Sequence, residues 1–279
     1  MPEIAFINGR FLPLAEASVS LDDRGFQFGD GIYEVIRTYQ GRPFQLEAHF
    51  GRLNCSAVAI GLVQPYSLEQ WRDYITEGLR LAAFPEAKIY LQITRGIAPR
   101  DHAYPSKLEP TAVMTVRELH PLAEAVQAAG VDAMTLEDIR WGRCDIKSIN
   151  LLANVLARQQ AKMAGMFEAI LVRDGQVTEG SVSNVILIKD RTLMTAPEGP
   201  RILSGVTRGV VLALARQEGL HVDERYPSQA QLYGASEVFL TGTTVEVLAV
   251  VRVDGKRIGA GEPGPITRSL AKRFLEQTG

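Results

Sequence analysis

Apolar and polar residues alternate along this chain with two different spacings. Alternation at every second position predicts β-strands, whereas apolar residues three or four positions apart predict amphipathic helices. The strand pattern occupies residues 4–14, 32–39, 88–95, 111–117, 131–136, 168–173, 176–179, 185–189, 192–195, 237–241 and 245–253. The helix pattern occupies residues 45–60, 68–82, the second half of 139–162, 207–218 and 266–276.

Turn signals separate these segments. Asn8-Gly9, Asp174-Gly175 and Asp254-Gly255 each stand between two strand patterns, and such pairs predict tight hairpins because both positions accept a positive φ. Residues 22–31 are punctuated by glycines, and we expect them to form a loop.

The two halves of the chain differ in the helices and strands that their patterns predict. The first half combines hairpins with two helices, and the second half is richer in strands. A stretch containing Pro121 separates them, so we predict an N-terminal α+β domain at 1–118, a linker at 119–123 and a C-terminal domain at 124–279. The predicted fold class is therefore α+β with two domains, the N-terminal one being the smaller.

Composition narrows the classes of function. The 279 residues are 46% hydrophobic and 22% charged, as in a folded globular protein. The net charge of −2 gives no electrostatic case for binding nucleic acid or an anionic membrane. No apolar run approaches the roughly 20 residues that span a bilayer, and the first residues do not follow the pattern of a signal peptide.

The cysteines and histidines give predictions about the cellular compartment and about metal binding. Two cysteines, Cys55 and Cys144, make no disulfide framework and fit a reducing cytosol, so we expect a cytoplasmic protein. The four histidines are scattered and none forms a His-Glu-x-x-His pair, so no metal site is expected.

The segment 139–162 organises the rest of the chain. Leu151, Leu152, Val155 and Leu156 have the spacing of one apolar helix face. The side chain of Ser148 or Asn150 is expected to cap this helix, and Gly165 to end it.

Lys147 stands just before this predicted helix. The helix dipole places partial positive charge there, which disfavours an ammonium by about 0.3–1 kcal/mol. A neutral lysine amine attacks carbonyl groups and forms Schiff bases. The segment taken alone leaves a second interpretation open, in which Lys147 is a solvated loop residue.

Two further segments suggest a bound ligand. In Thr178–Asn184, Glu179 ends a strand before a run of small residues, and a buried carboxylate there could keep a pyridine nitrogen protonated. In Ser204–Thr207, a helix start with free backbone N–H groups and hydroxyls makes an anion site. The alternatives are an exposed glutamate in a turn and an ordinary helix cap.

Two other segments carry polar groups that suit anions. Thr241–Thr244 follows a strand, and its hydroxyls and glycine could hold phosphate oxygens. Arg95–His102 is a loop in which Arg100 and His102 could grip a carboxylate. A simple β-turn and a solvated loop are the alternatives.

Together these segments resemble the fold-type IV pyridoxal-phosphate aminotransferases, and most closely the bacterial D-amino acid aminotransferases. The matching runs lie in the same order along nearly the whole chain, at residues 23–34, 95–102, 138–152, 178–185 and 203–208. The resemblance implies pyridoxal 5'-phosphate as cofactor and a larger, pseudobarrel-like C-terminal domain that binds it.

The resemblance also implies residue roles. Lys147 matches the lysine that forms the Schiff base with the cofactor and then carries the substrate's proton, and Glu179 matches the partner of the pyridine nitrogen. The other matches to cofactor-binding positions are Arg52 for the phosphate, Leu203 on the ring, the backbone of Val206 and Thr207, and the hydroxyl of Thr243. Tyr33, Arg100 and His102 match the trap for the substrate carboxylate, which the family shares across a homodimer interface.

The activity so implied is transamination of D-amino acids, such as D-alanine with 2-oxoglutarate. Alternatives within the family are a branched-chain L-amino acid transaminase, an (R)-amine transaminase and an aminodeoxychorismate lyase. A non-catalytic binder of a phosphate ligand is the alternative from another class. Gly142, Gly242 and Phe26 depart from the pattern of the best-known relatives, and Gly242 would cost one cofactor hydrogen bond, on the order of 1 kcal/mol.

Overall fold

The computed structural model describes residues 3–279, which divide into two compact units. Of the described residues, the first unit contains those from 3 to His120 together with Ile146–Asn150, and the second contains Pro121–Asp145 together with Leu151–Gly279. The domain boundaries expected at residues 118 and 124 stay a prediction. The segment Ile146–Asn150, which we expected in the C-terminal domain, packs with the first unit instead.

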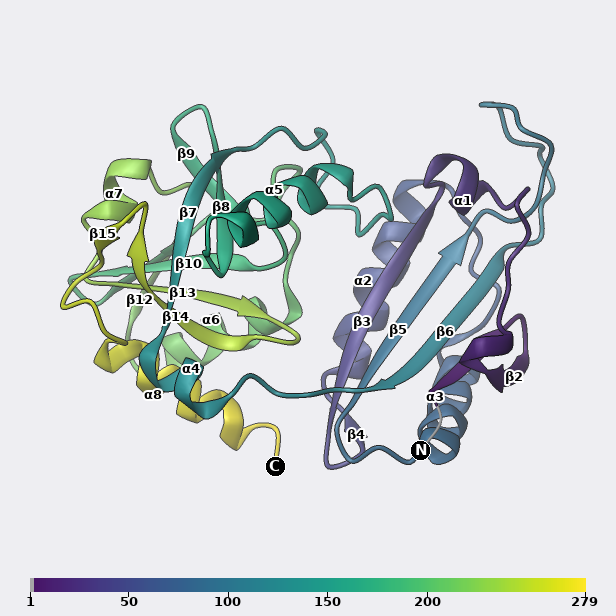
Figure 1. The fold of residues 1–279 in the computed structure, drawn as a ribbon, viewed down its shortest axis with the longest axis horizontal. Coiled ribbons are helices and arrows are strands. Elements are labelled where there is room, and N and C mark those ends of the chain that lie inside the picture. Colours follow the sequence, from purple (N-terminus) through teal and green to yellow (C-terminus); the bar gives the residue numbers. More distant parts are fainter. Residues whose placement is uncertain (1–2) are drawn as a thin grey trace. The chain divides into compact units, whose positions relative to one another are not determined.

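An antiparallel sheet forms the centre of the first unit (Figure 1). Its strands run in the order β2-β1-β6-β5-β3-β4. They are β1 (Ile4–Ile7), β2 (Arg10–Pro13), β3 (Gly31–Tyr39), β4 (Arg42–Pro43), β5 (Ala87–Thr94) and β6 (Thr111–Glu118). The helical elements are η1 (Leu14–Glu16), α1 (Arg24–Phe28), α2 (Leu46–Ala59) and α3 (Leu68–Ala82).

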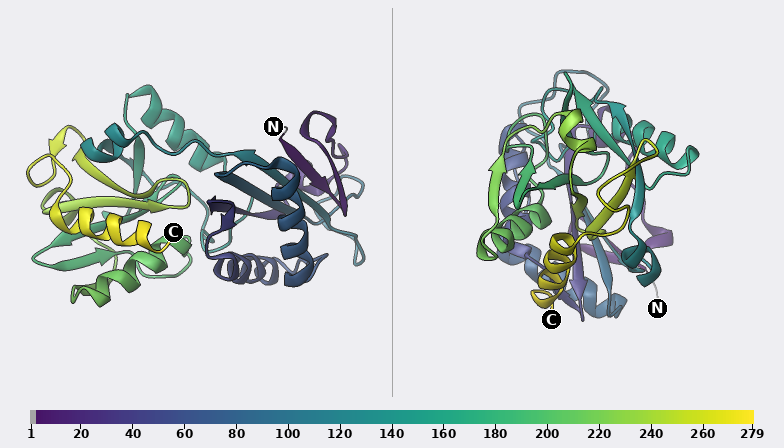
Figure 2. Two further views of the ribbon diagram at one scale, coloured as in Figure 1. Left: turned by 90° about the horizontal axis from the view of Figure 1, so that it is seen from below. Right: turned by 90° about the vertical axis from the view of Figure 1, so that its left-hand side faces the viewer.

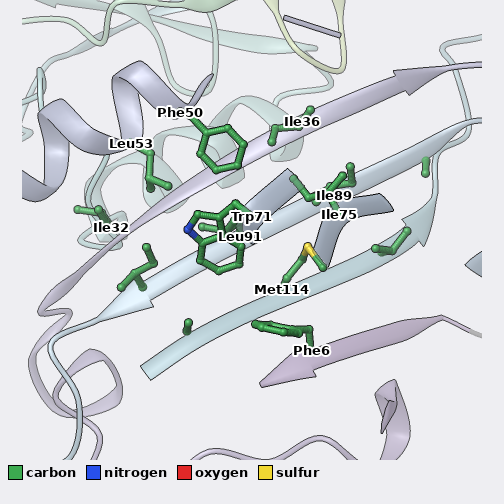
Figure 3. Packing of buried hydrophobic residues seen from close by; sticks show 14 of the residues in the cluster. Phe6, Ile32, Ile36, Phe50, Leu53, Trp71, Ile75, Ile89, Leu91 and Met114 are labelled. Atoms are coloured by element: carbon green, nitrogen blue, oxygen red, sulfur yellow. The ribbon is translucent and has the colours of Figure 1, made fainter. Parts of the chain in front are cut away.

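Helices α2 and α3 bury their apolar faces against this sheet. Helix α2 packs on β3, and α3 packs on β1 and β6. Figure 3 shows the resulting core, where Phe50 and Leu53 of α2 and Trp71 of α3 lie with strand residues such as Leu91. The predicted hairpin between β1 and β2 is present, and the two residues of its turn, Asn8 and Gly9, have φ values of 45° and 89°.

The second unit is built on a mixed sheet with the strand order β12-β11-β10-β13-β14-β7-β8-β9, and β15 pairs with β14. The strands are β7 (Val131–Glu137), β8 (Glu168–Arg173), β9 (Gln176–Gly180), β10 (Asn184–Lys189), β11 (Thr192–Thr195), β12 (His221–Glu224), β13 (Glu237–Gly242), β14 (Glu246–Val253) and β15 (Lys256–Arg257). The helices are α4 (Glu124–Ala129), α5 (Leu152–Met163), α6 (Val206–Gln217), α7 (Gln229–Tyr233) and α8 (Pro265–Glu276).

This sheet curls, because β9 at its edge also contacts β10. Strand residues that face inward, such as Ile170, Leu240 and Val250, form the core of the curl. Helix α5 packs outside on β8, where Ala157 and Ala161 meet alternate strand residues, and α6 and α8 pack against each other and β13 (Figure 2). The predicted two-part α+β fold with a pseudobarrel-like second part is confirmed.

Two local predictions were wrong. The glycine-punctuated loop at 22–31 contains helix α1, because Asp23 accepts a hydrogen bond from Gly25 N and caps it. Helix α5 begins after Leu151 without a described side-chain cap, because the Asn150 side chain donates to Gly29 O instead.

The apolar face expected on α5 is also oriented differently. Leu152, Val155 and Leu156 are exposed, whereas the small residues Ala157 and Ala161 are buried. The spacing of the leucines therefore marks an apolar surface and not the packed face. In the part of the chain that the structure describes, we find no helix long and apolar enough to cross a membrane.

Candidate active site

The backbone of Lys147 is held by two elements of the first unit. Tyr33 N on β3 donates to Lys147 O at 2.9 Å, and Lys147 N donates to Ser56 Oγ on α2 at 3.1 Å. The Lys147 side chain lies over Tyr33, with Nζ 4.2 Å from the centre of the tyrosine ring. Ser148 pairs with Ile32, which explains why this short segment joins the first unit. Lys147 is therefore placed by packing and not left as a solvated loop residue.

Arg52 and Glu34 lie in the same cluster. Arg52 donates from Nε to Glu34 Oε1 at 2.7 Å and from Nη2 to Glu34 Oε2 at 2.9 Å. His49 Nδ1 lies 2.8 Å from Glu34 Oε2. The side chain of Glu34 is 1% exposed and that of Arg52 is 12% exposed. The buried carboxylate of Glu34 thus holds the partly exposed guanidinium of Arg52 in place.

The charges around Glu34 set its ionisation. Burial alone would raise the pKa of Glu34, but the charge and hydrogen bonds of Arg52, the hydrogen bond of His49 and the charge of Lys147 lower it to about 2. Burial lowers the pKa of His49 and outweighs the opposing effect of Glu34. A neutral His49 with its proton on Nδ1 then donates to the Glu34 carboxylate, which can only accept.

Glu179 is the last residue but one of β9 in the second unit and is buried. Among the described residues, three donate to its carboxylate. Asn184 Nδ2 and Leu203 N each lie 3.0 Å from Oε2, and Arg140 Nη1 forms an ion pair with Oε1. Burial raises the pKa of Glu179, and the charge of Arg140 opposes this shift. Glu179 is therefore not the exposed turn residue that the alternative interpretation required.

Arg140 is a residue that the motif analysis did not single out. Its guanidinium donates from Nε to Asp138 Oδ1 and from Nη2 to Asp138 Oδ2, both at 2.9 Å, while Nη1 reaches Glu179. Thr178 Oγ1 donates to Asp138 Oδ2 at 2.9 Å. The signal that could have found Arg140 is its place in the run 138–152 and its spacing of two residues from an acid.

The start of α6 follows Leu203 closely. Its N-cap is Gly205, which has no side chain to cap the helix, and the first turn of α6 contains no acidic residue. A Cβ atom on Gly205 would lie 2.0 Å from Asn184 Oδ1, so only glycine fits there. The alternative of an ordinary cap by Ser204 or Thr207 is not what the structure has, because the N-cap residue is Gly205. These N–H groups suit an anion.

Thr243 lies in the turn between β13 and β14, two residues beyond Thr241, which pairs with Asn184. Thr241 Oγ1 is buried and has no hydrogen-bond partner in the part of the chain that the structure describes. The end of β13 and the turn after it therefore carry two threonines, Thr241 and Thr243. At Gly142 a Cβ atom would meet nothing within 4 Å, so the space there is open.

The expected carboxylate trap is only partly assembled by the contacts of one chain. Arg100 and His102 lie together on Phe28, with the Arg100 guanidinium 4.6 Å and the His102 ring 5.4 Å from the centre of its ring. Tyr33 stacks on Tyr90 with ring centres 5.6 Å apart. Arg24 fixes the backbone of the loop that carries Arg100 and His102, because its guanidinium donates to Asp101 O at 2.6 Å and to His102 O at 3.1 Å.

The donor sets fit the groups of pyridoxal phosphate. In the first unit, the Lys147 amine suits an aldehyde and the Arg52 guanidinium suits a phosphate. In the second unit, the N–H groups at the start of α6 suit an anion such as a phosphate. Because a carboxylate offers about four lone-pair positions, the three described donors to Glu179 leave room for one pyridinium N–H.

Comparison with known proteins identifies the family. The model of the amino-transferase class IV family matches residues 31–253, which include every candidate residue named above. The chain belongs to the class IV aminotransferases. The predicted family, enzyme class and pyridoxal-phosphate cofactor of this aminotransferase are thereby confirmed.

Individual relatives are similar over almost the whole chain. A D-alanine aminotransferase of Bacillus licheniformis is 44% identical over 263 residues, which are 94% of this chain and 93% of that protein. The branched-chain amino acid aminotransferase of Escherichia coli has a TM-score of 0.92 at 26% identity, covering 99% of this chain and 94% of that one. The branched-chain aminotransferase of the archaeon Thermoproteus uzoniensis, solved with norvaline, has a TM-score of 0.88 at 26% identity, covering 98% and 93%.

Proposed function

We propose that this aminotransferase moves amino groups between D-amino acids and 2-keto acids, with D-alanine and 2-oxoglutarate as a representative pair. The observation that carries the proposal is the 44% identity, over 94% of the chain, to a D-alanine aminotransferase. The two branched-chain enzymes share the fold at the lower identity of 26%. A branched-chain L-amino acid activity is therefore the second candidate.

Seven residues are proposed to hold the cofactor. Lys147 binds its aldehyde carbon, Arg52 its phosphate and Glu179 its pyridine nitrogen. Leu203 packs on the ring, and the backbone of Val206 and Thr207 with the hydroxyl of Thr243 completes the phosphate site. When bound, pyridoxal phosphate draws electrons away from the Cα–H bond of the substrate.

Lys147 is proposed to move the proton of the reaction. A neutral Nζ takes the proton from Cα as a general base and returns it as a general acid. The hydrogen bonds of the Lys147 backbone to Tyr33 and Ser56 fix where that amine starts. The Tyr33 ring beside Nζ supports the protonated form by a cation–π contact.

Tyr33, Arg100 and His102 are proposed to bind the substrate carboxylate. Arg100 offers a planar fork of N–H donors that matches a carboxylate. The contacts of Arg100 and His102 with Phe28 keep both side chains at one place on the loop. The exposed position of both residues leaves them available to a second copy of the chain.

A homodimer is proposed because the trap of the family is shared between subunits. The surface of α5 supports this, since Leu152, Val155, Leu156 and Met163 are exposed on one helix. An apolar surface of this kind favours protein contact. We retain a cytoplasmic location as a prediction, on the cysteine usage described above.

A chirally resolved donor screen tests the activity. Purified protein with pyridoxal phosphate should convert D-alanine and 2-oxoglutarate to pyruvate and D-glutamate, with little turnover of L-valine. The reverse preference would reject the proposal in favour of the branched-chain activity. Lys147→Ala should lose both the yellow colour of the bound cofactor and turnover, and a colourless variant that still turns over would end the assignment of Lys147.

The trap is tested separately by Arg100→Ala. This variant should raise the KM for the amino acid far more than it weakens cofactor binding, because Arg100 is assigned to the substrate alone. Equal losses in both quantities would contradict the trap.

A further inference from the structure

The buried ion network behind Glu179 reaches beyond the residues that the family motifs point to. We infer that Arg140 is a positioning residue that orients Glu179 and holds it as a carboxylate toward the pyridine nitrogen of the cofactor. This inference rests on the proposed role of Glu179. It adds a residue that touches neither the substrate nor the cofactor in our assignment, and that acts through Glu179.

The first argument is the geometry of Arg140. Its side chain is 5% exposed, and each of its nitrogens has a partner: Nε and Nη2 bind Asp138, and Nη1 binds Glu179. Nη2 also lies 3.2 Å from Arg201 O. Because the guanidinium is planar, contacts in several directions fix its plane, and the plane fixes where Glu179 Oε1 must lie.

The second argument is the distribution of charge. Asp138 is 0% exposed and takes two N–H groups of Arg140, so this carboxylate competes with Glu179 for the same cation. Arg173 reduces that competition, because its Nη2 lies 3.1 Å from Asp138 Oδ1 and also donates to Arg140 O at 2.9 Å. The network therefore contains two cations and two carboxylates, and Arg140 can neutralise Glu179.

The third argument is the direction of the ionisation of Glu179. Burial raises the pKa of Glu179, and Arg140 opposes that shift by its charge and by a hydrogen bond. Without Arg140, burial and the negative charge of Asp138 would both favour the neutral acid. A neutral acid cannot form an ion pair with a pyridinium, so the cofactor would lose its charged contact at the ring nitrogen.

The test compares binding of pyridoxal phosphate with binding of an analogue that carries carbon in place of the ring nitrogen. Arg140→Met should weaken pyridoxal phosphate binding about tenfold, as the loss of one charge-assisted hydrogen bond does. The analogue should bind the variant and the unmodified enzyme within about twofold, because it presents no N–H to Glu179. A loss that is equal for both ligands means a merely structural role and overturns the inference.

Two variants separate this inference from the proposed site. Glu179→Gln should weaken pyridoxal phosphate but not the analogue, and combining it with Arg140→Met should add no further loss. If Glu179→Gln leaves the two ligands unaffected, the role of Glu179 itself fails. If Glu179→Gln has the expected effect and Arg140→Met does not, only the inference about Arg140 fails.

Controls address folding and charge. Arg143→Met removes a nearby exposed arginine that pairs with the half-buried Asp145, and it should leave both dissociation constants unchanged. Arg140→Lys keeps the charge and should restore most of the affinity for pyridoxal phosphate. If Arg140→Met does not fold, the pair Asp138→Asn with Arg140→Gln removes one charge of each sign and should show the same selective loss. Equal binding of pyridoxal phosphate by that pair and by the unmodified enzyme would overturn the inference.

Discussion

The two units each bury a glutamate against an arginine, and the two carboxylates respond in opposite ways. The pKa of Glu34 in the first unit is lowered to about 2, whereas burial raises the pKa of Glu179 in the second unit. Both side chains are almost fully buried. Burial alone therefore does not decide whether such a group is ionised.

The difference comes from how each arginine is shared. Arg52 gives two N–H groups to Glu34, and His49 adds a third donor. Arg140 gives one N–H group to Glu179 and two to Asp138, whose own charge acts against Glu179. An arginine that serves two acids stabilises each of them less than an arginine that serves one.

This contrast suits the two proposed roles. A strongly ionised Glu34 keeps Arg52 in a fixed orientation, which a phosphate site needs. A less favoured charge on Glu179 gains stability when a pyridinium N–H arrives to share it. A glutamate–arginine pair thus holds the arginine in a fixed orientation in the first unit, and it leaves the glutamate able to accept a further hydrogen bond in the second unit.

The largest expected effect is on folding stability. Glu34→Gln should lower the free energy of unfolding of the cofactor-free protein by about 3–5 kcal/mol, because it removes the buried negative charge that forms an ion pair with Arg52. Glu179→Gln should cost about 1 kcal/mol, because Arg140 keeps Asp138. Urea denaturation measures both values.

A matched control is Glu47→Gln on the same helix as Arg52. Glu47 pairs with Arg72 at the surface, with 66% of its side chain exposed, so this variant should cost less than about 1 kcal/mol. Equal losses for Glu34→Gln and Glu179→Gln would remove the basis of the comparison.

The second expected effect is the loss of folding stability at low pH. The folded-state pKa of Glu34 is below its ordinary value of 4.5, so its contribution is present above pH 4.5 and is lost as pH falls toward 2. That contribution is on the order of 3 kcal/mol, and Glu34→Gln should lack the corresponding loss. Unfolding free energies measured between pH 5 and about 2 provide the test.

Glu179 should act with the opposite sign. Its raised pKa means that its contribution is present below the unfolded value of 4.5 and is lost as pH rises through the folded value. Glu179→Gln should therefore lose more stability than the unmodified protein when the pH is lowered. A Glu179→Gln curve parallel to that of the unmodified protein would contradict the raised pKa.

The smallest expected effect comes from the hydroxyl that supports Asp138. Thr178→Val removes the 2.9 Å hydrogen bond to Asp138 Oδ2, and Arg140 should then be drawn further toward Asp138. We expect a loss of about 1 kcal/mol in unfolding free energy and a weakening of pyridoxal phosphate binding smaller than that of Arg140→Met. A calorimetric titration with the cofactor measures the second quantity, and tighter binding would show that Asp138 and Glu179 do not compete for Arg140.

Features that depend on neighbouring residues were predictable from the chain alone. The hairpin at Asn8-Gly9 and the helices at 46–59 and 68–82 formed where the patterns placed them, because turn chemistry and a repeating apolar face act over a few residues. Lys147 and Glu179 stood out because each lies beside a motif with a chemical meaning, and their roles in cofactor binding stay predictions.

Features that depend on contacts distant in sequence were decided only by the tertiary structure. Asn150 leaves the start of α5 uncapped because its side chain finds Gly29 O, and Leu152, Val155 and Leu156 are exposed because the alanines of α5 fit closer to β8. Arg140 became visible for the same reason, since its link to Glu179 spans 39 positions of the chain. Local spacing predicts which elements form, but which charges share a partner depends on packing.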